Sequence, residues 1–279
     1  MASVETFCWL CLVVYVINIV HMIIKTETER EILREGGKRL AGILQRLGEM
    51  TKPGMTKQGL EDTAREMIAE LGDKPATLGY KPKGAKREYP AALCVSVNDE
   101  IVHGVPNEGD GKDKPFKDGD IVAIDCLLNH EGLITDSAIT VGVGEVSEED
   151  KRLMEAVKEA RAAGIAQAVA GNKIGRIGKA VSDVAKKYGY KLPPELGGHG
   201  VGKSVHERPF IPNYEDGPDS DVVLKEGQVI AIEPMMSRGS AKLKLASDGY
   251  TYKVADGSQT AHFEHTVIVG KSCAEVLTK

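Results

Sequence analysis

Two ten-residue stretches of the chain, FKDGDIVAID at residues 116–125 and LKEGQVIAIE at residues 224–233, match each other without a gap. Lys, Gly, Ala and Ile recur at the same places, and the other six positions differ conservatively or semi-conservatively. Each copy places an Asp-Gly or Glu-Gly turn before an apolar run that is typical of a buried strand. The runs end in carboxylates, Asp125 and Glu233. The chain therefore contains an internal repeat whose two strands both end in an acid.

The repeat extends on both sides of these strands. Downstream, DSAITVG from Asp136 matches EHTVIVG from Glu264, so that a second acid precedes a second strand in each half. Upstream, His103-Gly-Val matches His199-Gly-Val. Self-similarity of this kind indicates repeated structural units. The simplest geometry is a pair of half-domains related by a pseudo-twofold axis, with the four acids meeting at that axis.

Hydrophobic periodicity predicts helices and strands along the whole chain. Four helices are expected: residues 27–50, Thr56 to about Gly72, Ser147 towards Gly171, and residues 174–188. Thr56 and Ser147 are the candidate N-caps. Strands are expected at residues 92–97, 120–128, 137–144, 228–233 and 265–270. Long helices together with β-branched strands predict an α/β or α+β fold, and residues 25–279 are expected to form one domain because no low-complexity linker divides them.

The composition excludes some classes of partner. The formal net charge is −5 and the isoelectric point about 5.9, so the chain lacks the basic footprint of a nucleic-acid-binding domain. Aromatic residues make up only 5%, which argues against base-stacking surfaces. The cysteines are odd in number and irregularly spaced, which favours a reducing, cytoplasmic compartment over a disulfide framework; they are Cys8, Cys11, Cys94, Cys126 and Cys273.

The first 24 residues form an apolar extension. Residues 7–24, FCWLCLVVYVINIVHMII, are an 18-residue apolar run broken only by Asn18 and His21. This length is borderline for a membrane span, and the absence of a basic segment before it makes it a poor signal peptide. Three interpretations stay open: a membrane anchor with the catalytic domain in the cytoplasm, a buried helix, and an upstream start wrongly assigned ahead of Met22.

The paired acids and His199 predict a metal centre. A single acid at a strand end is commonly exposed or paired with a cation, but four converging carboxylates would raise each other's pKa values. Two divalent ions about 3.5–4 Å apart can share such a set through bridging carboxylates. A set of oxygen ligands with one imidazole is typical of Mn, Fe(II) or Co sites, whereas structural zinc sites are rich in thiolates. The glycines beside His199 are expected to let a metal and a substrate approach its backbone.

Five motifs, in their order along the chain, resemble those of type I methionine aminopeptidases. They are VHGVP (102–106), TDSA (135–138), GHGVGKSVHERP (198–209), AIEPM (231–235) and FEHT (263–266), and the resemblance covers about residues 22–279. It implies the pita-bread fold, a pseudo-symmetric α/β structure with a central antiparallel sheet flanked by helices. It also implies two divalent ions (Co, Mn, Fe(II) or Zn) with five ligands: Asp125, Asp136, His199, Glu233 and Glu264.

The resemblance implies an activity as well: removal of the initiator methionine from nascent proteins and peptides by a metal-activated bridging hydroxide. His103 and His206 would contact the scissile peptide, and His206 would hydrogen-bond the charge that develops on its carbonyl oxygen. Glu233 is the candidate for the proton shuttle. The expected partners are the N-termini of nascent chains, with contact to the ribosome left open, and the expected state is a monomer.

Four residues are expected, by similarity to the family, to line the slot for the methionine side chain: Tyr89, Cys94, Val205 and Tyr250. Two of them depart from the family pattern, because the residue before His206 is often aromatic and the position of Tyr250 often carries Trp. We therefore expect a roomier or altered pocket. Comparing kcat/KM for methionine, norleucine and leucine at the first position tests this hypothesis, and an equally strict preference for methionine would refute it.

Three other functions are compatible with parts of the sequence, and one of them, a membrane-tethered scaffold, rests on residues 7–24 alone. Xaa-Pro peptidases share the GHGxG and HExP patterns, but they usually carry a further N-terminal domain, and VHGVP fits the methionine enzymes better. A non-catalytic binding protein of the same fold would typically have lost metal ligands, whereas all five are present here.

The remaining histidines are assigned structural roles. His130 is expected in a solvent-exposed hairpin turn, NHEG. Strand alternation is expected to point His262 and His265 away from the face that carries Glu264. The basic segment 81–89 is expected to be a solvated loop.

Overall fold

The computed structural model describes residues 22–24, 26–82, 84–109 and 111–279. The greater part of the apolar run at residues 7–24, up to residue 21, lies outside the described residues. In the part of the chain that is described, no helix combines the length and the apolar character that a membrane crossing requires.

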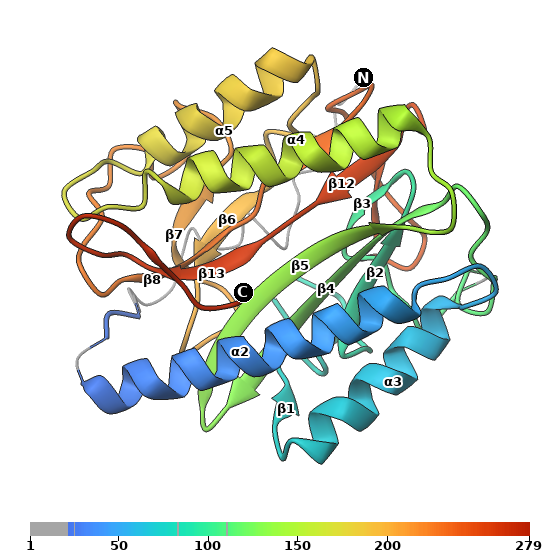
Figure 1. Cartoon of the computed structure of the whole chain (residues 1–279), viewed down its shortest axis with the longest axis horizontal. Helices are drawn as coiled ribbons and strands as arrows, with labels where there is room; N and C mark the ends of the chain where they lie inside the picture. The colour runs from blue at the N-terminus through green and yellow to red at the C-terminus, as the bar shows by residue number, and fades with distance from the viewer. Residues whose placement is uncertain (1–21, 25, 83, 110) are drawn as a thin grey trace.

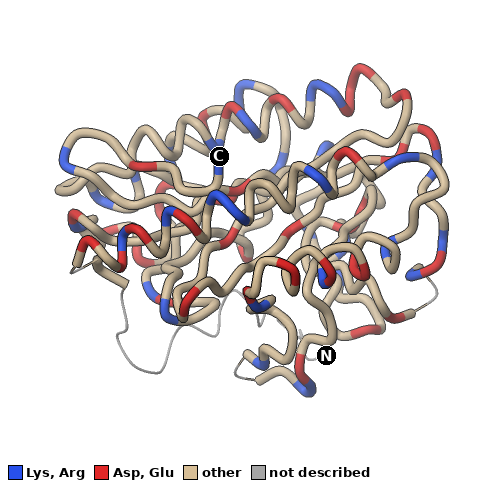
Figure 2. Tube along the Cα trace, turned by 60° about the horizontal axis from the view of Figure 1, so that its bottom comes forward, with Lys and Arg blue, Asp and Glu red and all other residues tan. Residues whose placement is uncertain are grey.

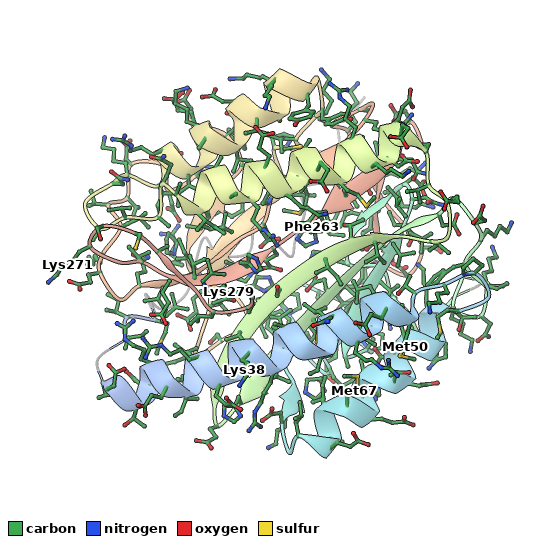
Figure 3. The ribbon with its side chains drawn as sticks, in the orientation of Figure 1. Lys38, Met50, Met67, Phe263, Lys271 and Lys279 are labelled. Carbon is green, nitrogen blue, oxygen red and sulfur yellow. The ribbon has the colours of Figure 1, made fainter. Side chains whose placement is uncertain are left out.

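The first half of the chain forms an antiparallel sheet with two helices packed against it. Strand β4 (Ile121–His130) pairs with β1 (Lys74–Pro75), β2 (Leu93–Val97) and β5 (Leu133–Gly142). Helices α2 (Glu27–Met50) and α3 (Lys57–Glu70) bury their apolar faces on this sheet (Figure 1). Met50 and Met67, labelled in Figure 3, pack at the margin of this core.

The second half repeats this arrangement. Its five-stranded antiparallel sheet has the order β14-β13-β8-β6-β7. The bounds are β6 (Gly197–Gly200), β7 (Glu207–Pro212), β8 (Val229–Ile232), β13 (His265–Ile268) and β14 (Glu275–Val276). Helices α4 (Glu148–Ile165) and α5 (Gly175–Tyr188) pack side by side over this half (Figure 1). The two halves thus each combine a sheet with a pair of helices.

Short strands complete the fold and help to join the halves. Strand β11 (Tyr252–Val254) pairs with both β10 (Leu243–Leu245) and β3 (Glu100–Val102), so a strand of the second half pairs with one of the first. Strand β12 (Thr260–His262) pairs with β9 (Met235–Ser237). Figure 2 shows acidic and basic residues interspersed along the described part of the chain.

The internal repeat corresponds to two equivalent strand pairs. Strand β4 pairs with β5 in the first half, and β8 pairs with β13 in the second. The halves meet where β5 runs beside residues 262–266: the Glu264 N–H donates to the Ala138 carbonyl at 2.9 Å, and the Ser137 hydroxyl donates to the Glu264 carbonyl at 2.9 Å. The segments that carry the predicted acids therefore lie at the seam between the halves.

Most predicted elements are present, with three differences. Helix α4 ends at Ile165 and does not continue towards Gly171. The prediction that His130 is exposed is wrong: the residue is only 6% exposed, and its Nδ1 lies 2.7 Å from Asp73 Oδ1. Segment 81–89 is only partly a solvated loop, because Arg87 bonds Glu108 and the Asp248 carbonyl.

Candidate functional site

Five predicted ligands converge from five places in the fold. Asp125 lies within β4, Asp136 within β5 and His199 within β6. Glu233 directly follows β8, and Glu264 lies between β12 and β13. All five line one cavity of about 40 Å³. A cavity of roughly 10–15 Å³ already holds a water molecule, so this one has room for small ions or water.

His199 faces the carboxylates with its Nε2 atom. Its Nδ1 lies 2.9 Å from the Gly200 carbonyl, which can only accept a hydrogen bond, so Nδ1 carries the proton. Nε2 lies 3.5 Å from Asp136 Oδ2 and 3.4 Å from Glu233 Oε1. Potential ligand atoms of Asp136, His199 and Glu264 all lie within 4.8 Å of one another. This spacing fits a shared cation.

The glycines beside His199 serve strand packing. A Cβ on Gly198 would lie 2.2 Å from the Ala231 carbonyl oxygen, and one on Gly200 would lie 2.3 Å from the Arg208 carbonyl oxygen. Strand packing is thus one reason for these glycines, and the expectation that they also make room for a metal and a substrate stays a prediction. They let β6 approach its neighbours β8 and β7, and so place His199 in the cavity.

The buried carboxylates of the cavity repel one another, so a nearby positive charge would stabilise their ionised forms. Burial raises the pKa of Asp136 well above its usual range, and the nearby carboxylates of Glu264 and Asp125 raise it further. Burial, followed by Glu233 and Asp125, does the same to the pKa of Glu264, and burial also raises the pKa of Asp125. Asp125 Oδ1, Asp136 Oδ1 and Glu264 Oε1 are buried without a hydrogen-bond partner among the described residues. Divalent cations would satisfy these oxygens and offset the repulsion.

Two threonine hydroxyls each form a pair of hydrogen bonds, called a clip here, to the backbone of the other half beside the acids of the cluster. The Thr266 hydroxyl accepts from the Asp136 N–H at 2.8 Å and donates to the Asp136 carbonyl at 2.7 Å. The Thr140 hydroxyl makes the same pair of bonds to His262, at 2.9 and 2.6 Å. Each threonine thus joins its own half to the backbone of the other. The carboxylates of the cluster extend from a backbone that is fixed on both sides of the seam.

The two predicted catalytic histidines border the same cavity. The centroids of the His206 and His199 rings lie 4.3 Å apart, and His206 Nδ1 is 3.0 Å from the Tyr80 hydroxyl. His103 has a positive φ of 59°, and its Nδ1 has no hydrogen-bond partner among the described residues. Burial lowers the pKa of His103 to about 3 and that of His206 well below its usual range. Both rings are therefore neutral near pH 7.

Three of the four predicted pocket residues line the cavity, namely Tyr89, Cys94 and Val205. Tyr250 is not among the lining residues. It lies behind Tyr89, edge to face at 5.0 Å between ring centroids, and Arg87 covers its other side at 5.3 Å. Any effect of Tyr250 on the pocket would therefore act through neighbours in its buried cluster, such as Tyr89 and Cys94.

Sequence reasoning missed some residues of the site. Thr77, Tyr80 and Leu127 line the cavity but belong to no repeat or charge pattern. The expectation that His262 faces away from the site is wrong: its Nε2 lies 3.5 Å from Glu233 Oε2. The signal was available, because His262 stands two positions before Glu264, and alternation places such residues on the same face. His265 instead bonds the Thr278 hydroxyl through Nδ1, at 2.8 Å.

Comparisons with known proteins agree with this geometry. The model of metallopeptidase family M24 matches residues 31–271. A methionine aminopeptidase of Aquifex aeolicus is 45% identical over 261 residues, which cover 92% of this chain and 100% of the relative. The crystal structure of methionine aminopeptidase from Thermotoga maritima matches with a TM-score of 0.85 and 39% identity, covering 92% of this chain and 100% of that one.

A prolidase shares the architecture more distantly. The enzyme from Pyrococcus furiosus matches with a TM-score of 0.70 and 23% identity, and the match covers 92% of this chain but 66% of the prolidase. This likeness shows the fold alone. The family model, the full-length relatives and the pseudo-symmetric halves agree, and the chain belongs to the methionine aminopeptidases of metallopeptidase family M24, with the pita-bread fold.

Proposed function

We propose that this protein removes the N-terminal methionine from peptides and nascent proteins, using two divalent ions held by Asp125, Asp136, His199, Glu233 and Glu264. The observation that carries the proposal is the convergence of these ligands in one cavity, with three buried carboxylate oxygens that no described protein group satisfies. The activity named for the Aquifex aeolicus relative supports the choice of substrate. The oxygen-rich set suits Mn, Fe(II) or Co, with Zn as a further candidate.

The side chains divide the remaining work. When bound, the ions would lower the pKa of water so that hydroxide forms near neutral pH. His103 and His206 would donate hydrogen bonds to the scissile peptide, each through the single N–H that a neutral ring carries. Glu233 would carry a proton on a carboxylate oxygen to the departing amine. Tyr89, Cys94 and Val205 would enclose the methionine side chain.

The first experiment is reconstitution after removal of metal. We would treat the full chain, and in parallel a chain that begins at Met22, with a chelator and add back Mn, Fe(II), Co or Zn separately. Free methionine released from Met-Ala-Ser is measured beside cleavage of an Xaa-Pro dipeptide. We expect metal-dependent release of methionine with the proline substrate intact.

Other outcomes would replace the proposal. Cleavage of the Xaa-Pro dipeptide alone would make the protein an Xaa-Pro peptidase of the same fold. Silence on both substrates with every metal, together with retained metal binding, would favour a binding protein. Asp136→Asn is the matched variant, because it keeps the shape of the side chain and removes the charge that a cation requires.

We further propose a cellular setting. The protein would act as a monomer on nascent N-termini in the cytoplasm, with or without contact to the ribosome. The alternative is attachment to a membrane through residues 7–24. Fractionating cells that express the tagged full chain, beside a version that begins at Met22, separates the two, since only an anchor would send the full chain alone to the membrane pellet.

A further inference from the structure

Glu207 is a buried carboxylate beside His206 that lies outside the proposed ligand set. It is the first residue of β7 and is only 4% exposed. Its Oε1 accepts hydrogen bonds from the backbone N–H groups of Lys203 and Ser204, at 2.6 and 2.9 Å. Its Oε2 accepts one from the backbone N–H of Met22, at 2.6 Å. One carboxylate therefore joins segments that lie 185 residues apart in the chain.

The loop that Glu207 holds carries two residues of the site. Residues 201–206 connect β6 to β7, and Lys203 and Ser204 at its tip are exposed. Val205 and His206 follow directly and line the cavity. Hydrogen bonds to a carboxylate are shorter and stronger than those between neutral groups. Fixing two successive N–H groups at the tip therefore restrains the backbone from which both side chains extend.

The third donor belongs to a segment that packs closely on this loop. The Met22 carbonyl accepts from the Val229 N–H at 3.0 Å, and the Ile24 N–H donates to the Gly227 carbonyl at 2.9 Å. The Met22 side chain is 1% exposed and covers Gly202, where a Cβ would lie 2.5 Å from Met22 Cγ. Residues 22–24 thus lie beside residues 227–229 and cover the start of the loop.

The geometry points to Glu207 as a positioning residue for the proposed reaction. Its carboxylate would link the loop tip to the ordered backbone at Met22 through hydrogen bonds, and would thereby hold His206 and Val205 at the cavity. The assignment rests on the proposed function only where methionine release is the readout. Glutamine could not replace the residue, because its amide offers one oxygen in place of two and its NH₂ group cannot accept an N–H.

The charge at residue 22 matters for the same contact. In a chain that continues before Met22, Glu207 accepts from a neutral peptide N–H. In a chain that begins at Met22, it would face an α-ammonium group, and the contact would become a buried ion pair. The strength of the link would therefore depend on how residue 22 is joined to the rest of the chain.

The test uses the full chain with Met22→Pro, which removes the backbone N–H and leaves Glu207 and every cavity residue in place. Two controls keep the N–H: Met22→Leu retains an apolar side chain of similar size, and Met22→Ala loses the side chain that covers Gly202, as proline does. We expect Met22→Pro to lower kcat by about tenfold with KM changed less than about twofold, since a misplaced catalytic group costs rate. Glu207→Gln should lower kcat at least as much, and it replaces Met22→Pro if that variant does not fold.

Two further readouts separate positioning from general damage. Hydrogen exchange at the amides of Lys203 and Ser204 should be faster in Met22→Pro and unchanged in Met22→Leu. Mn binding measured by calorimetry should match the wild type in all variants, because no ligand is touched. An unchanged kcat despite faster exchange would overturn the inference, and so would a loss of Mn affinity in step with kcat. If the wild type releases no methionine, the proposed function fails, while the exchange data still test the link.

Discussion

At the scale of single residues, Tyr80 fixes the chemistry of His206. The hydrogen bond that we propose from His206 Nε2 to the substrate requires a proton on that atom, so Nδ1 would have to act as an acceptor. The Tyr80 hydroxyl, 3.0 Å from Nδ1, is placed to donate the hydrogen bond that would stabilise this tautomer. We therefore expect Tyr80→Phe to lower kcat by about tenfold, less than the loss of a direct oxyanion donor would.

A kinetic comparison checks this prediction. Tyr214→Phe is the control, because it removes a tyrosine hydroxyl that bonds the Pro194 carbonyl outside the cavity. Steady-state release of methionine should then fall in the first variant and not in the second. Equal rates in the two variants would show that Tyr80 does not set the tautomer of His206.

His103 gives a pH dependence to the stability of the metal-free protein. Its pKa is about 3 in the folded chain, against an ordinary value of 6.5, mainly because the ring is buried and also because His262 and His199 lie nearby. The unfolded chain therefore takes up this proton first as the pH falls below 6.5. Its contribution to stability is present above that pH and is lost as the pH falls towards 3.

Urea unfolding of wild type and His103→Asn, both without metal, measures this contribution. Between pH 6.5 and about pH 5 the wild type should lose about 1–2 kcal/mol more of its free energy of unfolding than the variant does. Parallel pH profiles for the two proteins would contradict the prediction.

Most of the residues that the sequence made predictable share one property. The five proposed ligands and His103 recur in matched halves, so repetition marks them without any knowledge of the fold. His206 has no counterpart in the repeat and was found through the family motif at residues 198–209. Tyr80 and Thr77 come from a segment without a counterpart in the second half, and only the folded chain brings them to the cavity. Tyr250 was placed by family pattern, which does not distinguish a lining residue from one that supports it.

At the scale of elements, helix α3 depends on its first turn. Thr56 is its N-cap, and its hydroxyl accepts from the Gly59 N–H at 3.0 Å. We expect Thr56→Ala to cost about 1 kcal/mol of the free energy of unfolding, the usual cost of losing such a cap. Thr56→Ser keeps the acceptor and should stay near the wild type. Thermal or urea unfolding of the three proteins tests this, and an equal loss in both variants would refute capping as the cause.

The elements that sequence reasoning found and missed differ in length. Long amphipathic helices such as α2 and long apolar strands such as β4 carry many periodic positions. Strands β9 to β12 are three residues each, too short for alternation to show. Strand β6 is GGHG, a sequence with low strand propensity. Its backbone forms a strand because neighbouring strands on both sides pair with it, and that is a property of the tertiary fold.

At the scale of the whole molecule, Thr266 joins the two halves at the site. Thr266→Val keeps the shape of the side chain but leaves the Asp136 N–H and carbonyl without their partner. Buried groups left unpaired cost about 1–3 kcal/mol each, so we expect a loss of about 2–4 kcal/mol in the free energy of unfolding. Mn affinity should fall as well, because Asp136 is a proposed ligand.

Thr266→Ser is the control, since it restores the hydroxyl and loses one methyl group. Urea unfolding gives the stability, and calorimetric titration of the chelator-treated proteins gives the affinity for Mn. A destabilised Thr266→Val that binds Mn like the wild type would show that the clip supports the fold without placing the carboxylate.

The seam between the halves has a practical consequence. Asp125 and Asp136 come from the chain before the exposed turn at residues 144–145, and His199, Glu233 and Glu264 come from the chain after it. A polypeptide divided at that turn would give two fragments that are each inert, since neither owns a complete ligand set. If the fragments were fused to two proteins that bind each other, release of methionine would indicate that the two proteins had bound. This architecture is therefore a template for a split-enzyme sensor.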